Sequence, residues 1–229
     1  MKVFLAEFLR LIRKPIFFCS AVLTAGALWI GMGTDARWLL SGSFSESQWL
    51  LDTTFKARAN VLSLPLLSAL PSAASVWQEL SGGSVKNVLF RSGRREYLCS
   101  RTAVLPIVSF LSQLLGILLF LILVGALTRD SQFPLRLILP RLVLTMIFAL
   151  SGGIGAVLAQ DSACAYVIPV TLCFTLTMLK SRFLFNMKVL DPVALLSGEA
   201  GTLPGLLFLL LLFFFGFFLL LRKEIKRHV

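Results

Sequence analysis

Histidine is almost absent from this sequence: the single one, His228, lies next to the last residue. Metalloproteases and His-dependent acyltransferases need metal ligands or bases within the body of the chain. The four cysteines include no CxxC pair, and no GxxxxGK[ST] phosphate-binding loop occurs. We therefore predict a protein that is not an enzyme, with no catalytic residue, no metal site and no cofactor of its own.

Charged residues are also scarce. They make up 14% of the 229 residues, against roughly 25% in globular proteins, and hydrophobic residues make up 57%. Six windows of 18 or more residues contain no Asp, Glu, Lys or Arg, and a helix needs about 20 apolar residues to cross a bilayer. These runs are continuously apolar rather than alternating, which favours helices over barrel strands. We predict an all-α membrane protein, a single transmembrane domain over residues 1–229, with six transmembrane helices at about 15–34, 59–78, 102–128, 142–160, 162–179 and 204–221.

The basic residues indicate an orientation. With the N-terminus in the cytoplasm, thirteen Lys and Arg residues fall inside and nine fall outside, and cytoplasmic loops are enriched in these residues. We therefore predict that both termini face the cytoplasm of a cell whose plasma membrane holds the chain. The net charge of +11 is spread over both faces, so anionic lipid headgroups, and no nucleic acid, are its expected partners.

Residues 1–14 predict an amphipathic helix at the membrane surface. On a helical projection the charged residues share one arc and the apolar residues fill the opposite one. Pro15 permits a turn into the first transmembrane helix, and the alternative is a simple extension of that helix. The charged arc holds Lys2, Glu7, Arg10, Arg13 and Lys14, and the apolar arc includes Phe4 and Phe8.

Three features concern the membrane helices themselves. Pro65 and Pro71 predict a kink in the second. The small residues of Ser151–Gly155 predict close packing of the fourth against a neighbour. Asp161 is expected to cap a tight turn between the fourth and fifth.

Two regions are assigned to the outer side. Lys56, Arg58 and Asn60 lie at the outer entrance of the second transmembrane helix and could line an exit path for an anionic substrate. The alternative is that the two cations reach toward lipid headgroups. Residues 180–204 are too apolar for a free loop and too short to span, and Asp191-Pro192 resembles a helix start. They predict outer re-entrant helices.

A polar interruption at residues 79–98 lies between the second and third transmembrane helices. Gly82-Gly83 permits a turn, Ser84 is a candidate N-cap for a short helix, and Ser92-Gly93 marks a second break. We predict a short helix along the inner membrane surface. Force on such a helix would move both neighbouring transmembrane helices together.

The spacing of residues in this loop follows a pattern. Glu79 is followed after three residues by Gly83-Ser84-Val85-Lys86 and then by Val88-Leu89; Arg94 or Arg95 precedes Tyr97-Leu98. This resembles the cytoplasmic loop of ABC-2-type transporter permeases, the membrane halves of type V ABC exporters. The whole layout resembles the family as well, although Ser92-Gly93 stands where the family often has a proline before a Ser-Arg pair.

The resemblance implies a function. The chain would be a permease subunit that forms half of a translocation pathway for export of a peptide, a lipid or another lipophilic compound. Its partners would be ATP-binding cassette ATPase subunits, which hold ATP and Mg²⁺, and a second permease half, identical or related. The ATPase would dock on a coupling helix and its surroundings: Glu79, Gly83, Ser84, Val85, Lys86, Val88, Leu89, Arg94, Arg95 and Tyr97. The alternative is a membrane-embedded immunity or assembly factor that binds a peptide or partner protein without pumping.

Overall fold

The structure is a computed structural model that describes residues 2–33, 47–83, 85, 88–90, 93–128, 135–182 and 202–228. These residues are almost entirely helical and include no strand, which confirms the predicted all-α class. In chain order the helices are α1 (Lys2–Ile12), α2 (Pro15–Met32), α4 (Ser47–Lys56), α5 (Arg58–Ala69), α6 (Ala73–Ser81), α8 (Arg94–Thr128), α9 (Leu135–Ala159), α10 (Cys164–Arg182) and α12 (Thr202–His228).

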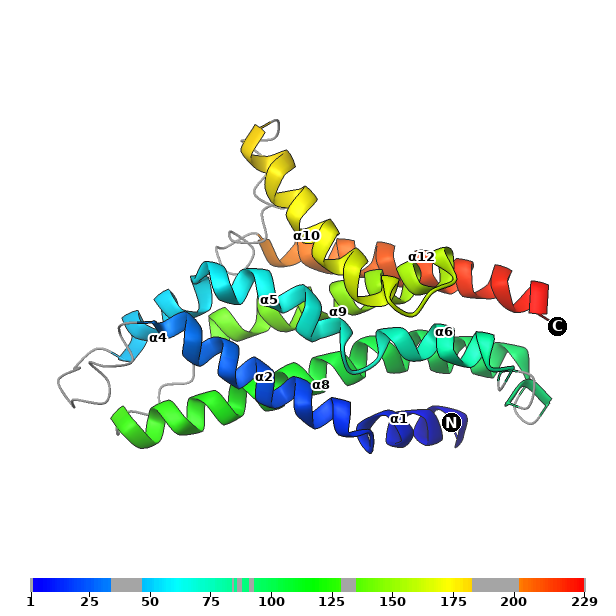
Figure 1. The fold of residues 1–229 in the computed structure, drawn as a ribbon, viewed down its shortest axis with the longest axis horizontal. Helices are drawn as coiled ribbons and strands as arrows, with labels where there is room; N and C mark the ends of the chain where they lie inside the picture. The colour runs from blue at the N-terminus through cyan, green and yellow to red at the C-terminus, as the bar shows by residue number, and fades with distance from the viewer. Residues whose placement is uncertain are drawn as a thin grey trace.

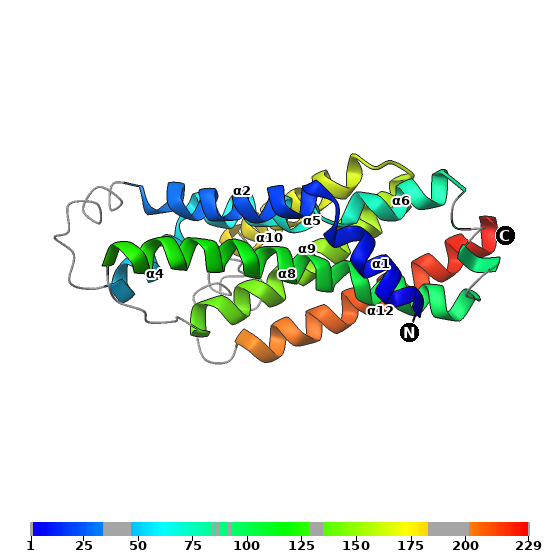
Figure 2. The same cartoon turned by 90° about the horizontal axis from the view of Figure 1, so that it is seen from below.

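The helices form an elongated bundle (Figure 1). Helices α2, α8, α9 and α12 lie lengthwise, α5 and α6 together make one further pass, and α10 leans away from the others. Both chain termini lie at one end, with α1, α6 and the first turns of α8 (Figures 1 and 2). We call this the α1 end. The opposite end, where α4 lies, is the α4 end.

Five helical segments are long and apolar enough to cross a membrane, and each overlaps one of the six predicted transmembrane helices. They are Pro15–Met32, Arg58–Ser81, Arg94–Ala126, Arg136–Ala159 and Leu203–Lys226. The apolar part of α10, Cys164–Leu179, is shorter, so the sixth crossing stays a prediction. The apolar residues of α12 lie mostly outside the core: Phe208, Leu211 and Phe215 are exposed, as expected of a helix that faces lipid.

The second membrane segment is broken where the sequence places a proline. Helix α5 ends at Ala69 and α6 begins at Ala73, on either side of Pro71, whereas Pro65 lies within α5. Proline cannot donate a backbone hydrogen bond and its ring crowds the preceding turn, so a break at Pro71 is expected. At this break the Ser72 hydroxyl contacts two groups of α8, the Leu105 carbonyl oxygen at 3.2 Å and the Ser109 hydroxyl at 3.1 Å.

The N-terminal helix is separate from the first membrane helix, as the amphipathic pattern predicts. Helix α1 ends at Ile12, Lys14 is extended with ψ of 135°, and α2 begins at Pro15. Leu11 packs with Val104 and Val108 of α8. The two faces differ from the expectation in one respect: Leu5 and Leu9 are exposed and Glu7 is buried, because the helix turns Glu7 toward Arg101 of α8.

Small residues bring the helices close together, as expected for the fourth membrane helix. A β-carbon on Gly152 of α9 would lie 3.1 Å from both the Ala73 β-carbon and the Pro169 ring. Gly116 of α8 plays the same part against α2, since its β-carbon would lie 2.6 Å from the Ala21 carbonyl oxygen. At the turn before α10, the Asp161 carboxylate accepts a hydrogen bond from the Ala163 amide at 3.0 Å. The predicted re-entrant helices lie mostly in residues 183–201, outside the described residues.

Candidate functional site: a buried ion-pair network at the α1 end

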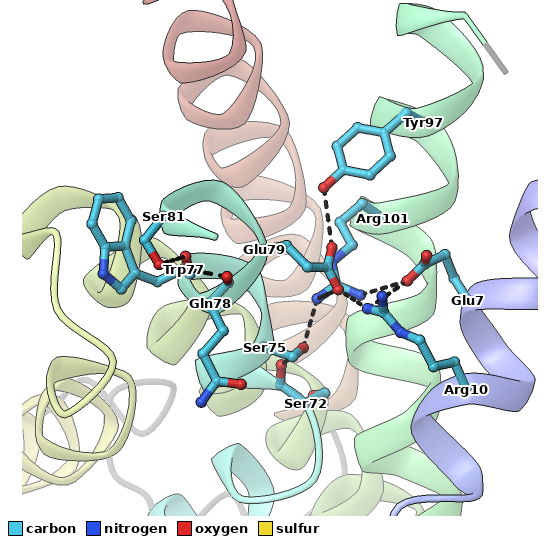
Figure 3. Close-up of polar contacts among 10 residues, drawn as sticks. All are labelled: Glu7, Arg10, Ser72, Ser75, Trp77, Gln78, Glu79, Ser81, Tyr97 and Arg101. Carbon is cyan, nitrogen blue, oxygen red and sulfur yellow. Dashed lines mark hydrogen bonds and ion pairs between the residues drawn. The ribbon is translucent and has the colours of Figure 1, made fainter. Parts of the chain in front are cut away.

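Four charged side chains from three helices meet at the α1 end (Figure 3). Arg101 of α8 lies at the centre. Its guanidinium nitrogens are 3.2 Å from a Glu7 carboxylate oxygen and 3.1 Å from a Glu79 carboxylate oxygen. Arg10 pairs with Glu7 at 2.9 Å and also with Glu79. Each carboxylate therefore contacts both guanidinium groups, and helices α1, α6 and α8 are joined through one set of charges.

Two neutral hydroxyl groups complete this set. The Tyr97 hydroxyl donates to a Glu79 carboxylate oxygen at 3.2 Å, and Arg101 donates to the Ser75 hydroxyl oxygen at 2.6 Å. Both come from helices already in the set, since Tyr97 is on α8 and Ser75 on α6. We refer to Glu7, Arg10, Ser75, Glu79, Tyr97 and Arg101 as the ion-pair network.

The charges of the ion-pair network balance, with two carboxylates and two guanidinium groups. This balance matters because Arg101 is fully buried and Glu7 and Glu79 are nearly so. An isolated charge in such a place is strongly disfavoured, whereas a paired and hydrogen-bonded one is tolerated. Burial lowers the pKa of the Arg10 guanidinium, and the adjacent Glu7 carboxylate opposes that shift.

Helical spacing brings each pair of network residues to one face. Glu7 and Arg10 are three residues apart on α1, and Ser75 and Glu79 are four apart on α6. Tyr97 and Arg101 are four apart on α8. Residues three or four apart lie one above the other on a helix, so each helix presents two polar groups to the same point.

The predicted coupling loop packs directly beside the ion-pair network. Val85 is buried in a cluster that includes Leu80 of α6, Tyr97 of α8 and Leu221 of α12. Val88 and Leu89 pack against the same cluster. The next residue is different: Phe90 is 90% exposed, the highest value among the large apolar side chains described. The loop is therefore fastened to three helices on one side and presents an aromatic ring on the other.

The remaining predicted loop residues are more peripheral. Gly83 is exposed with φ of 67°, in the left-handed region where glycine is favoured. Arg94 donates to the Arg222 carbonyl oxygen of α12 at 3.5 Å, and Arg95 is exposed. Ser84 and Lys86 lie outside the described residues, so the predicted N-cap stays a prediction.

The predicted residues of the N-terminal helix divide between two roles. The rings of Phe4 and Phe8 stack with centroids 6.1 Å apart and pack against the cluster of Leu11, Val104 and Val108. Arg10 belongs to the ion-pair network, and Arg13 is exposed.

The predicted outer pathway residues do not contact one another. Lys56 pairs with Asp52 at 2.5 Å, and Arg58 is exposed. Asn60 is fully buried and donates to the Thr54 carbonyl oxygen at 2.5 Å. The described contacts join none of the three to another, and their role in an outer pathway stays a prediction.

Several residues of this site were missed by sequence reasoning. Glu7 and Arg101 were counted only as surface or orientation charges, and Ser75 and Phe90 were given no role. One signal was present: Arg101 lies four residues after Tyr97, at the start of a long apolar run. An arginine at such a boundary, on the same face as a tyrosine, indicates a buried polar contact as readily as a loop charge.

The fold and the site define a class of protein. No protein-family model and no curated protein matches the sequence. Five helices that can cross a bilayer, exposed apolar side chains along α12 and a charge-balanced polar cluster at one end are the features of an integral membrane protein. Within the described residues, no three metal-ligating side chains lie together.

Proposed function

We propose that the chain is the permease subunit of an ABC-2-type transporter, which pairs with a second permease half and couples to a separate ATPase. The observation that supports this most is the joint position of the loop and the ion-pair network. The segment whose sequence resembles a coupling helix packs against α6, α8 and α12. Glu79, the first residue of the motif, lies on α6 and pairs with Arg10 of α1 and Arg101 of α8.

The contacts provide a route for mechanical work. A partner that pushes on residues 85–90 would displace α6 and α8 through the apolar cluster of Val85. Because Glu79 and Arg101 both pair with α1, α1 would follow. Charged hydrogen bonds resist separation inside a low-dielectric site. The three helices would thus move as one body, which is the behaviour required of the coupled end of a permease.

Phe90 is the residue that we expect to contact the partner ATPase. A ring that is 90% exposed in a segment otherwise packed by its apolar side chains has no packing role within the described residues. Exposed aromatic residues are enriched among the contacts that dominate protein interfaces. The partner ATPase would hold ATP and Mg²⁺, and this chain would hold neither.

The test is purification of the chain from the cells that produce it, with detection of a co-purifying phosphate-loop ATPase. Phe90→Asp is expected to reduce the retained ATPase at least about tenfold, in keeping with the loss of about 2 kcal/mol or more at a central aromatic contact. Folding should be unaffected because the side chain is exposed. Lys226→Asp, at an exposed position of α12 at the same end, is the matched control and should retain the ATPase.

Two results would count against the proposal. If Phe90→Asp retains the ATPase and its nucleotide-stimulated transport, residue 90 is not at the docking surface. If the wild-type chain purifies in active form with no ATPase at all, it is better described as an immunity or assembly factor.

A further inference from the structure

Arg141, at the other end of the bundle, is a fully buried arginine among apolar side chains. It lies on α9 and has an exposed fraction of 0%. Among the residues that the structure describes, none of its three guanidinium nitrogens has a hydrogen-bond partner. The Phe55 ring of α4 lies beside it, with its centroid 5.5 Å from the guanidinium carbon.

The side chains around Arg141 are apolar. Phe55 belongs to a buried cluster with Phe120 of α8 and with Ile138 and Leu142, which flank Arg141 on α9. A guanidinium group stays protonated in proteins and carries five N–H donors. An aromatic face attracts a cation but accepts none of these hydrogen bonds in the plane of the guanidinium. The described residues therefore provide an aromatic face for the charge of Arg141 and no hydrogen-bond acceptor for its N–H groups.

Comparison with Arg101 shows what is missing. Both arginines are fully buried on long membrane helices, but Arg101 contacts two carboxylates and a hydroxyl. The carboxylate nearest to Phe55 in sequence, Asp52, is committed to Lys56 at 2.5 Å. No ion pair to Arg141 occurs in the described part of the chain. An ionisable side chain inside the membrane without a partner is a candidate for ligand binding.

We propose that the α4 end contains a binding site for an anionic group, a carboxylate or phosphate, held by the Arg141 guanidinium beside Phe55. The planar guanidinium matches both anions through paired hydrogen bonds. Arg141 lies six residues after Leu135, or roughly 9 Å along the helix, so the site is near the end of the membrane segment. Either a soluble anionic ligand or the phosphate of a phospholipid can supply this group. The inference does not depend on docking of an ATPase at the opposite end.

The test uses the purified full-length chain in neutral detergent, with its thermal unfolding midpoint measured against added ligand. The probes are inorganic phosphate and phosphatidylglycerol, and diacylglycerol serves as a lipid without phosphate. A ligand that binds the folded state raises the midpoint in a saturable manner. We expect this with phosphate, phosphatidylglycerol or both, and not with diacylglycerol. A response to phosphate identifies a soluble anion, and a response to phosphatidylglycerol alone identifies a lipid.

The variant Arg141→Gln keeps a polar side chain and removes the charge. It should weaken the apparent affinity about tenfold or more, as expected for loss of a charged hydrogen bond. Arg136→Gln, at an exposed position of the same helix, should respond like the wild type. Without added anion, Arg141→Gln should unfold at the wild-type temperature or above, because it removes an unpaired buried charge.

Three results would overturn the proposal. The first is an equal response of the wild type and Arg141→Gln. The second is the absence of a response to either phosphate-containing probe. The third is a lower midpoint or failure to fold of Arg141→Gln without added anion, which would show that the chain itself supplies the partner of Arg141.

Discussion

Replacing Arg101 with glutamine is expected to destabilise the protein by about 3–5 kcal/mol, the usual cost of breaking a buried ion pair by removing one partner. The loss is large because Arg101 is fully buried and is paired with both Glu7 and Glu79. Without it, the two nearly buried carboxylates lose one of the two guanidinium groups that contact them. The other belongs to Arg10, whose side chain is 41% exposed. The free energy of unfolding, measured by denaturant titration in micelles and followed by circular dichroism, checks the prediction.

A multiple variant separates charge balance from packing. Arg101→Met combined with Glu7→Gln and Glu79→Gln removes the buried charges together, and it should recover most of the loss, since apolar or neutral groups of similar volume often replace buried ion pairs without penalty. Arg95→Gln, at an exposed position of the same helix, should change stability by less than about 0.5 kcal/mol. Equal stability of Arg101→Gln and the wild type would show that the ion-pair network does not hold α1, α6 and α8 together.

Introducing a carboxylate at Val85 is expected to detach the loop from the bundle. Val85 is 2% exposed, among apolar side chains of α6, α8 and α12, and an unpaired carboxylate is strongly disfavoured there. The loop sequence contains trypsin sites at Lys86 and Arg91. Cleavage of a transiently opened segment follows the population of its open form. The rate of tryptic cleavage between residues 82 and 94 should therefore rise about tenfold for each 1.4 kcal/mol by which the substitution lowers the free energy of opening the loop.

The matched control is Phe90→Asp, which places the same carboxylate five residues later on an exposed position. It should leave the cleavage rate at the wild-type value, and under the proposed function it should also weaken ATPase binding. The two variants thus distinguish the packed side of the loop from its exposed side. If Val85→Asp is no more readily cleaved than Phe90→Asp, the apolar cluster of Val85 does not hold the loop.

The coarse architecture could be predicted because it follows from local physical requirements. Uncharged runs such as 102–128 mark membrane helices, since a charge within the bilayer is costly wherever it occurs. The separation of α1 from α2 was evident from the switch to an all-apolar sequence at Pro15. The break at Pro71 follows from the missing backbone donor.

The candidate site was predicted only in part because its contacts join distant residues. Glu79 and Tyr97 were identified through the loop pattern, but Arg101, which pairs with Glu79, was not. Arg101 also pairs with Glu7 across 94 positions of sequence. Helical periodicity shows which face of α1 is charged; it does not show that this face meets two other helices. The isolation of Arg141 was equally hidden, because its burial depends on α4, α8 and α9 together.

Site-specific photo-crosslinking from residue 90 in intact membranes tests the central claim most directly. A photoreactive phenylalanine analogue replaces Phe90, which is exposed and can carry the probe without disturbing the fold. The account predicts a covalent adduct with a phosphate-loop ATPase, strengthened or weakened by added ATP as the partner changes shape. Adducts with lipid alone would contradict it. So would a Phe90→Cys variant that is labelled only by thiol reagents confined to the outer side of the membrane.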